Sequence, residues 1–163
     1  KKNNTIELLI CAPVKMSEIV IGKFLSALGF VTILLVLTIP YPLSLYLAAK
    51  PDWGVIAMCY LGTFMMIGVY IAVGTLCSSL TENQIIAGAL TFGAVLFFWI
   101  IKWASYNAGP VWGEILGYLS VIDHFEDFSR GVFNTKDLIF YLSAITTGLF
   151  LTHKNLESYS WRA

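Results

Sequence analysis

Residues 24–49 of this 163-residue chain read FLSALGFVTILLVLTIPYPLSLYLAA, a run of 26 positions without a charged side chain. A helix rises 1.5 Å per residue and a bilayer core is about 30 Å thick, so roughly 20 apolar residues cross it. Two further uncharged runs follow, of 29 residues at 53–81 and of 19 residues at 83–101. A signal peptide would supply one short run near the start, so three successive runs predict a polytopic membrane protein.

The overall composition agrees with a membrane location. Hydrophobic residues make up 58% of the chain and charged residues 12%, against about 25% charged residues in soluble domains. Ten basic residues balance ten acidic ones, and the basic residues form no cluster. This excludes the positive face of a nucleic-acid-binding protein.

A fourth, shorter uncharged run covers residues 138–152, or about 22 Å of helix. Polar side chains border this run, with Lys136 and Asp137 before it and His153 and Lys154 after it. Their polar ends can extend to the membrane surface. We therefore predict an all-α, polytopic transmembrane helical bundle with four spans. The expected spans are about 20–48, with a bend at Pro40-Tyr41-Pro42, then 54–79, 84–103 and 137–153.

The distribution of basic residues predicts the orientation of the chain. With four spans, both ends of the chain lie on one side of the membrane. That side holds Lys1, Lys2, Lys15, Lys23, Lys154 and Arg162, and the opposite side holds Lys50, Lys102, Arg130 and Lys136. Six basic residues against four favour cytoplasmic termini, because basic residues accumulate in cytoplasmic loops.

A short helix is expected before the first span. Thr5 with Leu8 and Leu9 can begin it, and Pro13 should end or kink it, because proline lacks a backbone N–H. Such a helix is either an amphipathic anchor at the membrane surface or a docking helix for a cytoplasmic partner. The residues alone leave both interpretations open.

Small residues four positions apart occur within the second and third spans, as Gly68 with Ala72 and Ala89 with Gly93. Small side chains allow transmembrane helices to approach closely. We expect these pairs to form packing contacts within the chain rather than a contact between subunits.

One polar cluster lies at 120–131, within a segment too short to span the membrane. On a helix, Asp123 and Asp127 would share a face, and Glu126 would lie four residues before Arg130. The cluster therefore predicts an amphipathic helix with internal ion pairs at the outer membrane surface.

This helix carries no predicted metal site. Asp123, His124 and Asp127 have suitable ligand atoms, but His124 is rotated about 100° from Asp123 on a helix, so the three do not converge. We expect Phe125 and Phe128 to face the bilayer. A membrane enzyme that uses these three polar residues remains an alternative, which unchanged activity after His124→Ala would exclude.

Other sequence signals of catalysis are absent. The chain has no Gly-x-x-x-x-Gly-Lys-Ser/Thr for ATP, no His-Glu-x-x-His and no Gly-x-Ser-x-Gly. We predict no catalytic, cofactor-binding or metal-binding residues, and hence a chain that is not itself an enzyme.

Eight short segments occur in a characteristic order along nearly the whole chain. They are Thr5-Ile6-Glu7-Leu8-Leu9, Ala12-Pro13-Val14, Glu18-Ile19-Val20, Gly22-Lys23-Phe24, Pro51-Asp52-Trp53-Gly54, Ser78-Ser79-Leu80-Thr81-Glu82-Asn83-Gln84, Asp123-His124-Phe125-Glu126-Asp127-Phe128 and Arg130-Gly131. Together they resemble the ABC-2 type transporter permeases, especially the gliding-motility and nitrous-oxide-cluster type of bacterial permease.

The resemblance implies a six-span exporter subunit of the bacterial inner membrane. Such a permease pairs with a second copy or a paralogue, contacts membrane lipid, and uses cytoplasmic ABC ATPase subunits that bind ATP and Mg. The four spans here would be the third to sixth of the family, so that 1–163 is the C-terminal part of one permease domain without its first two spans.

The resemblance also assigns roles to two further segments. Residues 5–14 would be the cytoplasmic coupling helix, and 110–133 an external interfacial or re-entrant helix pair. The ATPase-contact residues would be Thr5, Glu7, Leu8, Leu9, Ala12 and Pro13. The alternative function is a non-transporting membrane scaffold that anchors an ATPase or a secretion complex.

Overall fold

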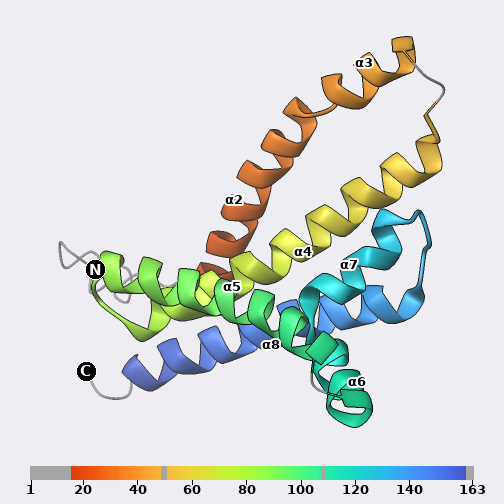
Figure 1. Cartoon of the computed structure of the whole chain (residues 1–163). Coiled ribbons are helices and arrows are strands. Elements are labelled where there is room, and N and C mark those ends of the chain that lie inside the picture. The colour runs from red at the N-terminus through yellow and green to blue at the C-terminus, as the bar shows by residue number, and fades with distance from the viewer. Residues whose placement is uncertain (1–15, 49–50, 108, 161–163) are drawn as a thin grey trace.

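The computed structural model describes residues 16–48, 51–107 and 109–160, and every regular element in these ranges is an α-helix. The all-α prediction is therefore confirmed (Figure 1). In chain order the helices are α2 (Met16–Leu37), α3 (Pro40–Ala48), α4 (Trp53–Leu80), α5 (Gln84–Asn107), α6 (Gly109–Leu119), α7 (Val121–Ser129) and α8 (Thr135–Ser160).

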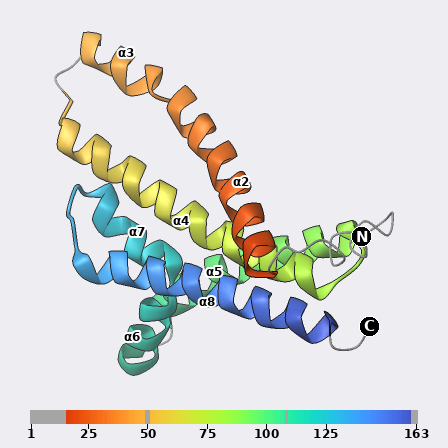
Figure 2. The same cartoon turned by 180° about the vertical axis from the view of Figure 1, so that it is seen from behind.

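Helix α4 is the central element of the bundle. It has 28 residues and begins at an N-cap, where the Asp52 carboxylate accepts a 2.9 Å hydrogen bond from the Gly54 N–H. It contacts α2, α5, α7 and α8. Figures 1 and 2 show α2 on one side of α4 and α7 with α8 on the other.

Hydrogen bonds between helices define their relative directions. Lys23 Nζ of α2 donates to Ser78 Oγ of α4 over 2.8 Å, whereas Thr38 near the other end of α2 meets the Tyr60 hydroxyl at 2.9 Å, so α2 and α4 are antiparallel. Asn155 Nδ2 of α8 donates to Ser79 Oγ over 2.9 Å. The start of α2 and the ends of α4 and α8 thus meet at one end of the bundle, which we call the Ser79 end.

The first predicted span is bent, as expected, and is divided between two helices. Helix α2 ends at Leu37, and α3 begins at Pro40. Proline fits the first position of a helix, where its missing N–H costs no hydrogen bond. Three segments of the described residues are long and apolar enough to cross a membrane, namely Met16–Tyr46, Trp53–Leu80 and Gln84–Asn107.

The fourth predicted span is part of α8, a 26-residue helix that continues well beyond the expected end at residue 153. Its composition does not place it among the three apolar segments. It nevertheless runs parallel to α4, from Ile145 beside Gly68 to Asn155 beside Ser79. The helix is confirmed, and its crossing of the membrane remains a prediction that this packing supports.

The small residues of α4 lie at helix contacts within the chain, as predicted. A Cβ atom on Gly68 would lie 3.0 Å from a side chain of α8, and Ala72 is fully buried beside Gly148. The prediction is wrong for α5, because Gly93 has no described neighbour within 4 Å of such a Cβ and Ala89 is exposed. Small residues allow close packing but do not by themselves specify which neighbour occupies the space.

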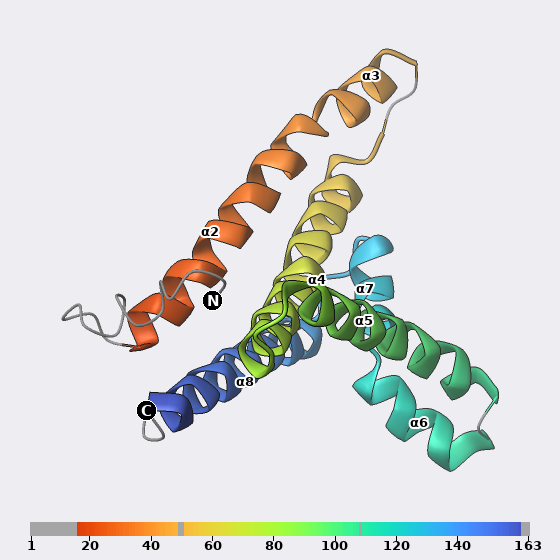
Figure 3. The same cartoon turned by 90° about the vertical axis from the view of Figure 1, so that its left-hand side faces the viewer.

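Two short helices, α6 and α7, occupy most of the segment 110–133. Helix α6 lies against α5, and its first residue, Gly109, has a φ of 75°. Figure 3 shows this α5–α6 hairpin projecting from the rest of the bundle. Helix α7 instead packs against α4, which places its polar residues between α5 and α8.

Candidate functional site

The predicted ATPase-contact residues lie outside the described residues. These are Thr5, Glu7, Leu8, Leu9, Ala12 and Pro13. The described chain starts at Met16, the first residue of α2, which belongs to the Ser79 end. The contact of residues 5–14 with an ATPase therefore remains a prediction.

Several charged and polar side chains of the described residues lie together at the other end of the bundle, where α5 ends and α8 begins. Lys102 of α5 forms an ion pair with Glu126 of α7, and its Nζ lies 3.7 Å from Asp123 Oδ1. The Lys102 side chain is only 21% exposed. Two carboxylates offset the cost of removing this ammonium from water, and they join α5 to α7.

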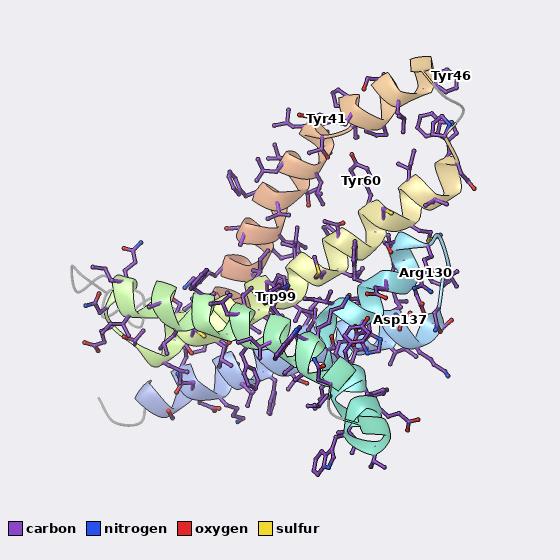
Figure 4. All side chains as sticks on the ribbon, in the orientation of Figure 1. Tyr41, Tyr46, Tyr60, Trp99, Arg130 and Asp137 are labelled. Atoms are coloured by element: carbon purple, nitrogen blue, oxygen red, sulfur yellow. The ribbon has the colours of Figure 1, made fainter. Side chains whose placement is uncertain are left out.

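The predicted ion pair of Glu126 with Arg130, the C-cap residue of α7, is present. Arg130 Nη2 lies 3.7 Å from Glu126 Oε2, four residues earlier on the helix. The Arg130 side chain is 72% exposed, so the pair adds little to stability. Figure 4 labels Arg130 and Asp137 at this corner of the molecule.

The imidazole of His124 joins three helices. Its Nδ1 lies 2.6 Å from Asp137 Oδ1 of α8, and its Nε2 lies 3.1 Å from the backbone oxygen of Tyr118 in α6. The ring also stacks on Phe140 of α8, with 4.0 Å between the ring centres. Sequence reasoning missed Asp137 as a partner of His124, because the residues are 13 positions apart and no periodic pattern links them.

The three side chains considered above as possible metal ligands face different partners. His124 pairs with Asp137, Asp123 faces Lys102, and Asp127 Oδ2 accepts a 3.4 Å hydrogen bond from Asn134 Nδ2. Within residues 16–48, 51–107 and 109–160, no three His, Cys, Asp or Glu side chains are placed to hold a metal ion.

The expectation that Phe125 and Phe128 face the bilayer is wrong. Phe128 is fully buried, and both rings lie against Gly62 of α4. A Cβ atom on Gly62 would lie 2.6 Å from the Phe128 Cβ. Because Gly62 has no side chain, α7 can approach α4 closely and bury its aromatic face there rather than in lipid.

A second buried contact fixes the start of α7 to α8. Tyr141 of α8 is fully buried, and its hydroxyl donates a 2.7 Å hydrogen bond to the Val121 carbonyl. Ser120 caps α7 by accepting from the Asp123 N–H at 3.2 Å. The polar residues of α7 are thus held on a buried platform formed by α4 and α8.

We expect Gly62→Ala to weaken this platform. The added methyl group would meet the Phe128 Cβ, which cannot rotate away, so α7 must shift from α4 at a cost of about 1–3 kcal/mol. The measurement is the thermal unfolding midpoint of the full-length protein in detergent. Gly29→Ala is the matched control, because the same methyl group meets open space on α2. Equal midpoints for the two variants would contradict the packing described here.

One cavity between the described helices is wholly apolar. It has a volume of about 180 Å³ and lies between α2, α4 and α8. It is bordered by Phe24, Leu28, Phe64, Met65, Gly68, Leu142 and Ile145. An apolar cavity of this kind supplies packing space between helices rather than acids, bases or nucleophiles.

Comparison with known protein families gives a match over most of the chain. Residues 1–152 match the protein family described as "ABC-2 family transporter protein". No curated protein and no solved structure matches the chain. The matched region includes all the helices from α2 to α7 and most of α8. With a match over most of its length and three helices apolar enough to cross a bilayer, this multi-pass membrane protein belongs to the ABC-2 transporter family.

Proposed function

We propose that this chain is the permease subunit of an ATP-driven exporter and moves its substrate with ATP hydrolysed by a separate ABC ATPase. The family match over residues 1–152 is the observation that carries the proposal. In this proposal the ATPase binds ATP and Mg, and this chain supplies the membrane helices. A second permease copy or a paralogue completes the membrane part.

The contacts of the bundle suggest how a displacement would pass through it. Residues 5–14 precede α2, whose Lys23 is bonded to Ser78 of α4, and the neighbouring Ser79 is bonded to Asn155 of α8. A push on the start of α2 would therefore act on α4 and α8 together. Both helices reach α7, because α7 packs on each of them. Packed helices that shift as units are a common means of transmitting such movement.

The proposed orientation places the Ser79 end in the cytoplasm and α6 with α7 outside, in the bacterial inner membrane. The excess of basic residues on the side of the chain ends supports this orientation. The Ser79 end also holds Lys23 of α2 and the ion pair of Lys154 with Glu157, at 2.8 Å, near the end of α8.

Transport by reconstituted protein tests the proposal. The full-length permease and the ATPase that copurifies with it are placed in proteoliposomes loaded with candidate substrates, and ATP-dependent movement is measured. A permease gives movement that requires both proteins and ATP. If the ATPase binds and hydrolyses ATP but no candidate from any broad substrate class moves, the scaffold function replaces this proposal.

A further inference from the structure

Two hollows follow one another along the line where α2 passes α8. The first is the apolar cavity of about 180 Å³ described above, and the second, of about 250 Å³, lies nearer the Ser79 end. On the α2 side they are lined by Ser17, Val20, Ile21, Phe24 and Leu28. On the α8 side they are lined by Leu142, Ile145, Thr146, Leu149, Phe150 and His153. Residues three and four positions apart share a helix face, so each set forms one stripe, and we call the space between the two stripes the α2–α8 groove.

The α2–α8 groove opens to the lipid-facing surface of the protein. Helix α2 lies within a segment that is apolar enough to cross a membrane, and so does α4, which borders the first hollow. Ile21 and Phe150 line the groove and are 49% and 57% exposed. In a bilayer the medium at such a surface is hydrocarbon rather than water. Acyl chains of the membrane lipids can therefore enter the groove from the side.

The groove becomes polar where it approaches the Ser79 end. Ser17 and His153 border it there, and the buried His153 Nδ1 has no hydrogen-bond partner among the described residues. Thr146, by contrast, donates a 2.7 Å hydrogen bond to the Leu142 carbonyl of its own helix. Hydroxyl and imidazole N–H groups can donate to the ester and phosphate oxygens of a phospholipid. The groove thus combines an apolar length with a polar end, which is also how a phospholipid is built.

We propose that the α2–α8 groove binds a phospholipid of the surrounding bilayer, with one acyl chain in the groove and the ester and phosphate groups beside Ser17 and His153. A chain in the groove contacts two helices at once, whereas a chain on the outer face of a helix contacts one. The additional van der Waals contacts favour the groove, because an unfilled hollow loses them. The proposal depends on the membrane location of the helices and not on transport, so a failure to transport would leave it standing.

Photolabelling of the full-length protein tests this site. The protein is placed in phosphatidylcholine nanodiscs with a trace of a phosphatidylcholine that carries a diazirine in one acyl chain. After illumination, the labelled residues are identified by mass spectrometry. We expect Phe150 to take up more label than Phe92 of α5 and Phe30 of α2, although these two phenylalanines are more exposed, at 66% and 64%. Labelling that follows exposure alone would overturn the proposal.

The position of the diazirine tests the direction of the bound lipid. A diazirine near the glycerol should label Ser17 and His153, and one near the chain end should label Leu142 and Ile145. The reverse order would overturn the proposed placement of the headgroup. A groove filled by another segment of this chain or by a second copy would take up no excess lipid label, which would also overturn the proposal.

Thr146→Trp fills the second hollow with a larger side chain. The excess label on Phe150 should be lost in this variant, because the indole takes the space of the acyl chain. Thr147→Trp is the matched control, since Thr147 is also exposed but lines neither hollow. It should keep the excess label. Equal labelling of Phe150 in the two variants would overturn the site.

A second pair of variants approaches the same hollow from α2. Ile21→Trp should also remove the excess label from Phe150, and it keeps the test decisive if Thr146→Trp fails to fold. Ile33→Trp is its control, because Ile33 is 61% exposed on α2 and lines neither hollow. Retention of the excess label in the Ile21 variant would overturn the proposal.

Discussion

Replacing Glu7 by lysine is expected to uncouple ATP hydrolysis from transport while the protein still inserts and folds. In the proposed function, Glu7 belongs to a coupling helix and contacts the ATPase. If Glu7 meets a basic partner in that proposed contact, a reversed charge replaces an attraction by a repulsion, and like-charge contacts across an interface cost several kcal/mol. Transport in proteoliposomes should therefore fall by at least about tenfold, since each 1.4 kcal/mol corresponds to a factor of ten.

The matched control for this change is Asn4→Lys, which adds a lysine next to the same segment but outside residues 5–14. It should transport like the wild type. Membrane insertion and the unfolding midpoint should be unchanged in both variants. Normal transport by the Glu7 variant would remove Glu7 from the proposed contact, although the family membership of the chain would stand.

Truncating Phe128 to alanine is expected to be the most destabilising single change at the polar end of the bundle. The ring is fully buried, lies against Gly62, and is 6.2 Å from the ring centre of Tyr141. Removal of a buried phenylalanine ring leaves a cavity and costs about 3 kcal/mol or more. At roughly 2–4 °C per kcal/mol for a domain of this size, the unfolding midpoint should fall by about 6–12 °C.

Phe30→Ala is the control for that experiment. Phe30 is 64% exposed on α2, so its truncation removes contacts with detergent or lipid but leaves no internal cavity. Its midpoint should stay close to that of the wild type. A similar loss for Phe30 and Phe128 would mean that α7 does not pack on α4 as described.

The long helices were predictable from sequence because each depends on its own residues. An uncharged run of sufficient length forms a helix in a bilayer whatever lies beside it, since every backbone polar group must be satisfied within the segment. The same holds for the bend before Pro40, which follows from the missing N–H of proline. The pair of Glu126 with Arg130 was also predictable, because four residues separate neighbours on one helix face.

Which face of each helix packs against a neighbouring helix was not predictable in the same way. In a soluble protein the buried face of a helix is more apolar than the exposed face, but lipid is as apolar as the interior of a membrane bundle. Phe128 illustrates the difficulty, because facing lipid and packing on Gly62 satisfy its hydrophobicity equally. The contact was decided by shape, since the space beside Gly62 admits the Phe128 side chain.

The polar contacts between helices required the tertiary structure for a related reason. Lys102 lies 24 residues from Glu126, and His124 lies 13 residues from Asp137. Neither separation corresponds to a helical repeat, so no local rule brings the partners together. They meet because α7 is seated on α4 and α8, which orients its charged face toward α5.

The amino-acid sequence by itself therefore determined that this protein is a bundle of long membrane helices, because hydropathy and helix length act residue by residue. Only the tertiary structure decided that α8 runs parallel to α4, that α7 turns its aromatic side inward, and that His124 is placed between Asp137 and Tyr118. These features depend on which surfaces fit together, and complementary shapes of distant segments leave no periodic trace in the order of the residues.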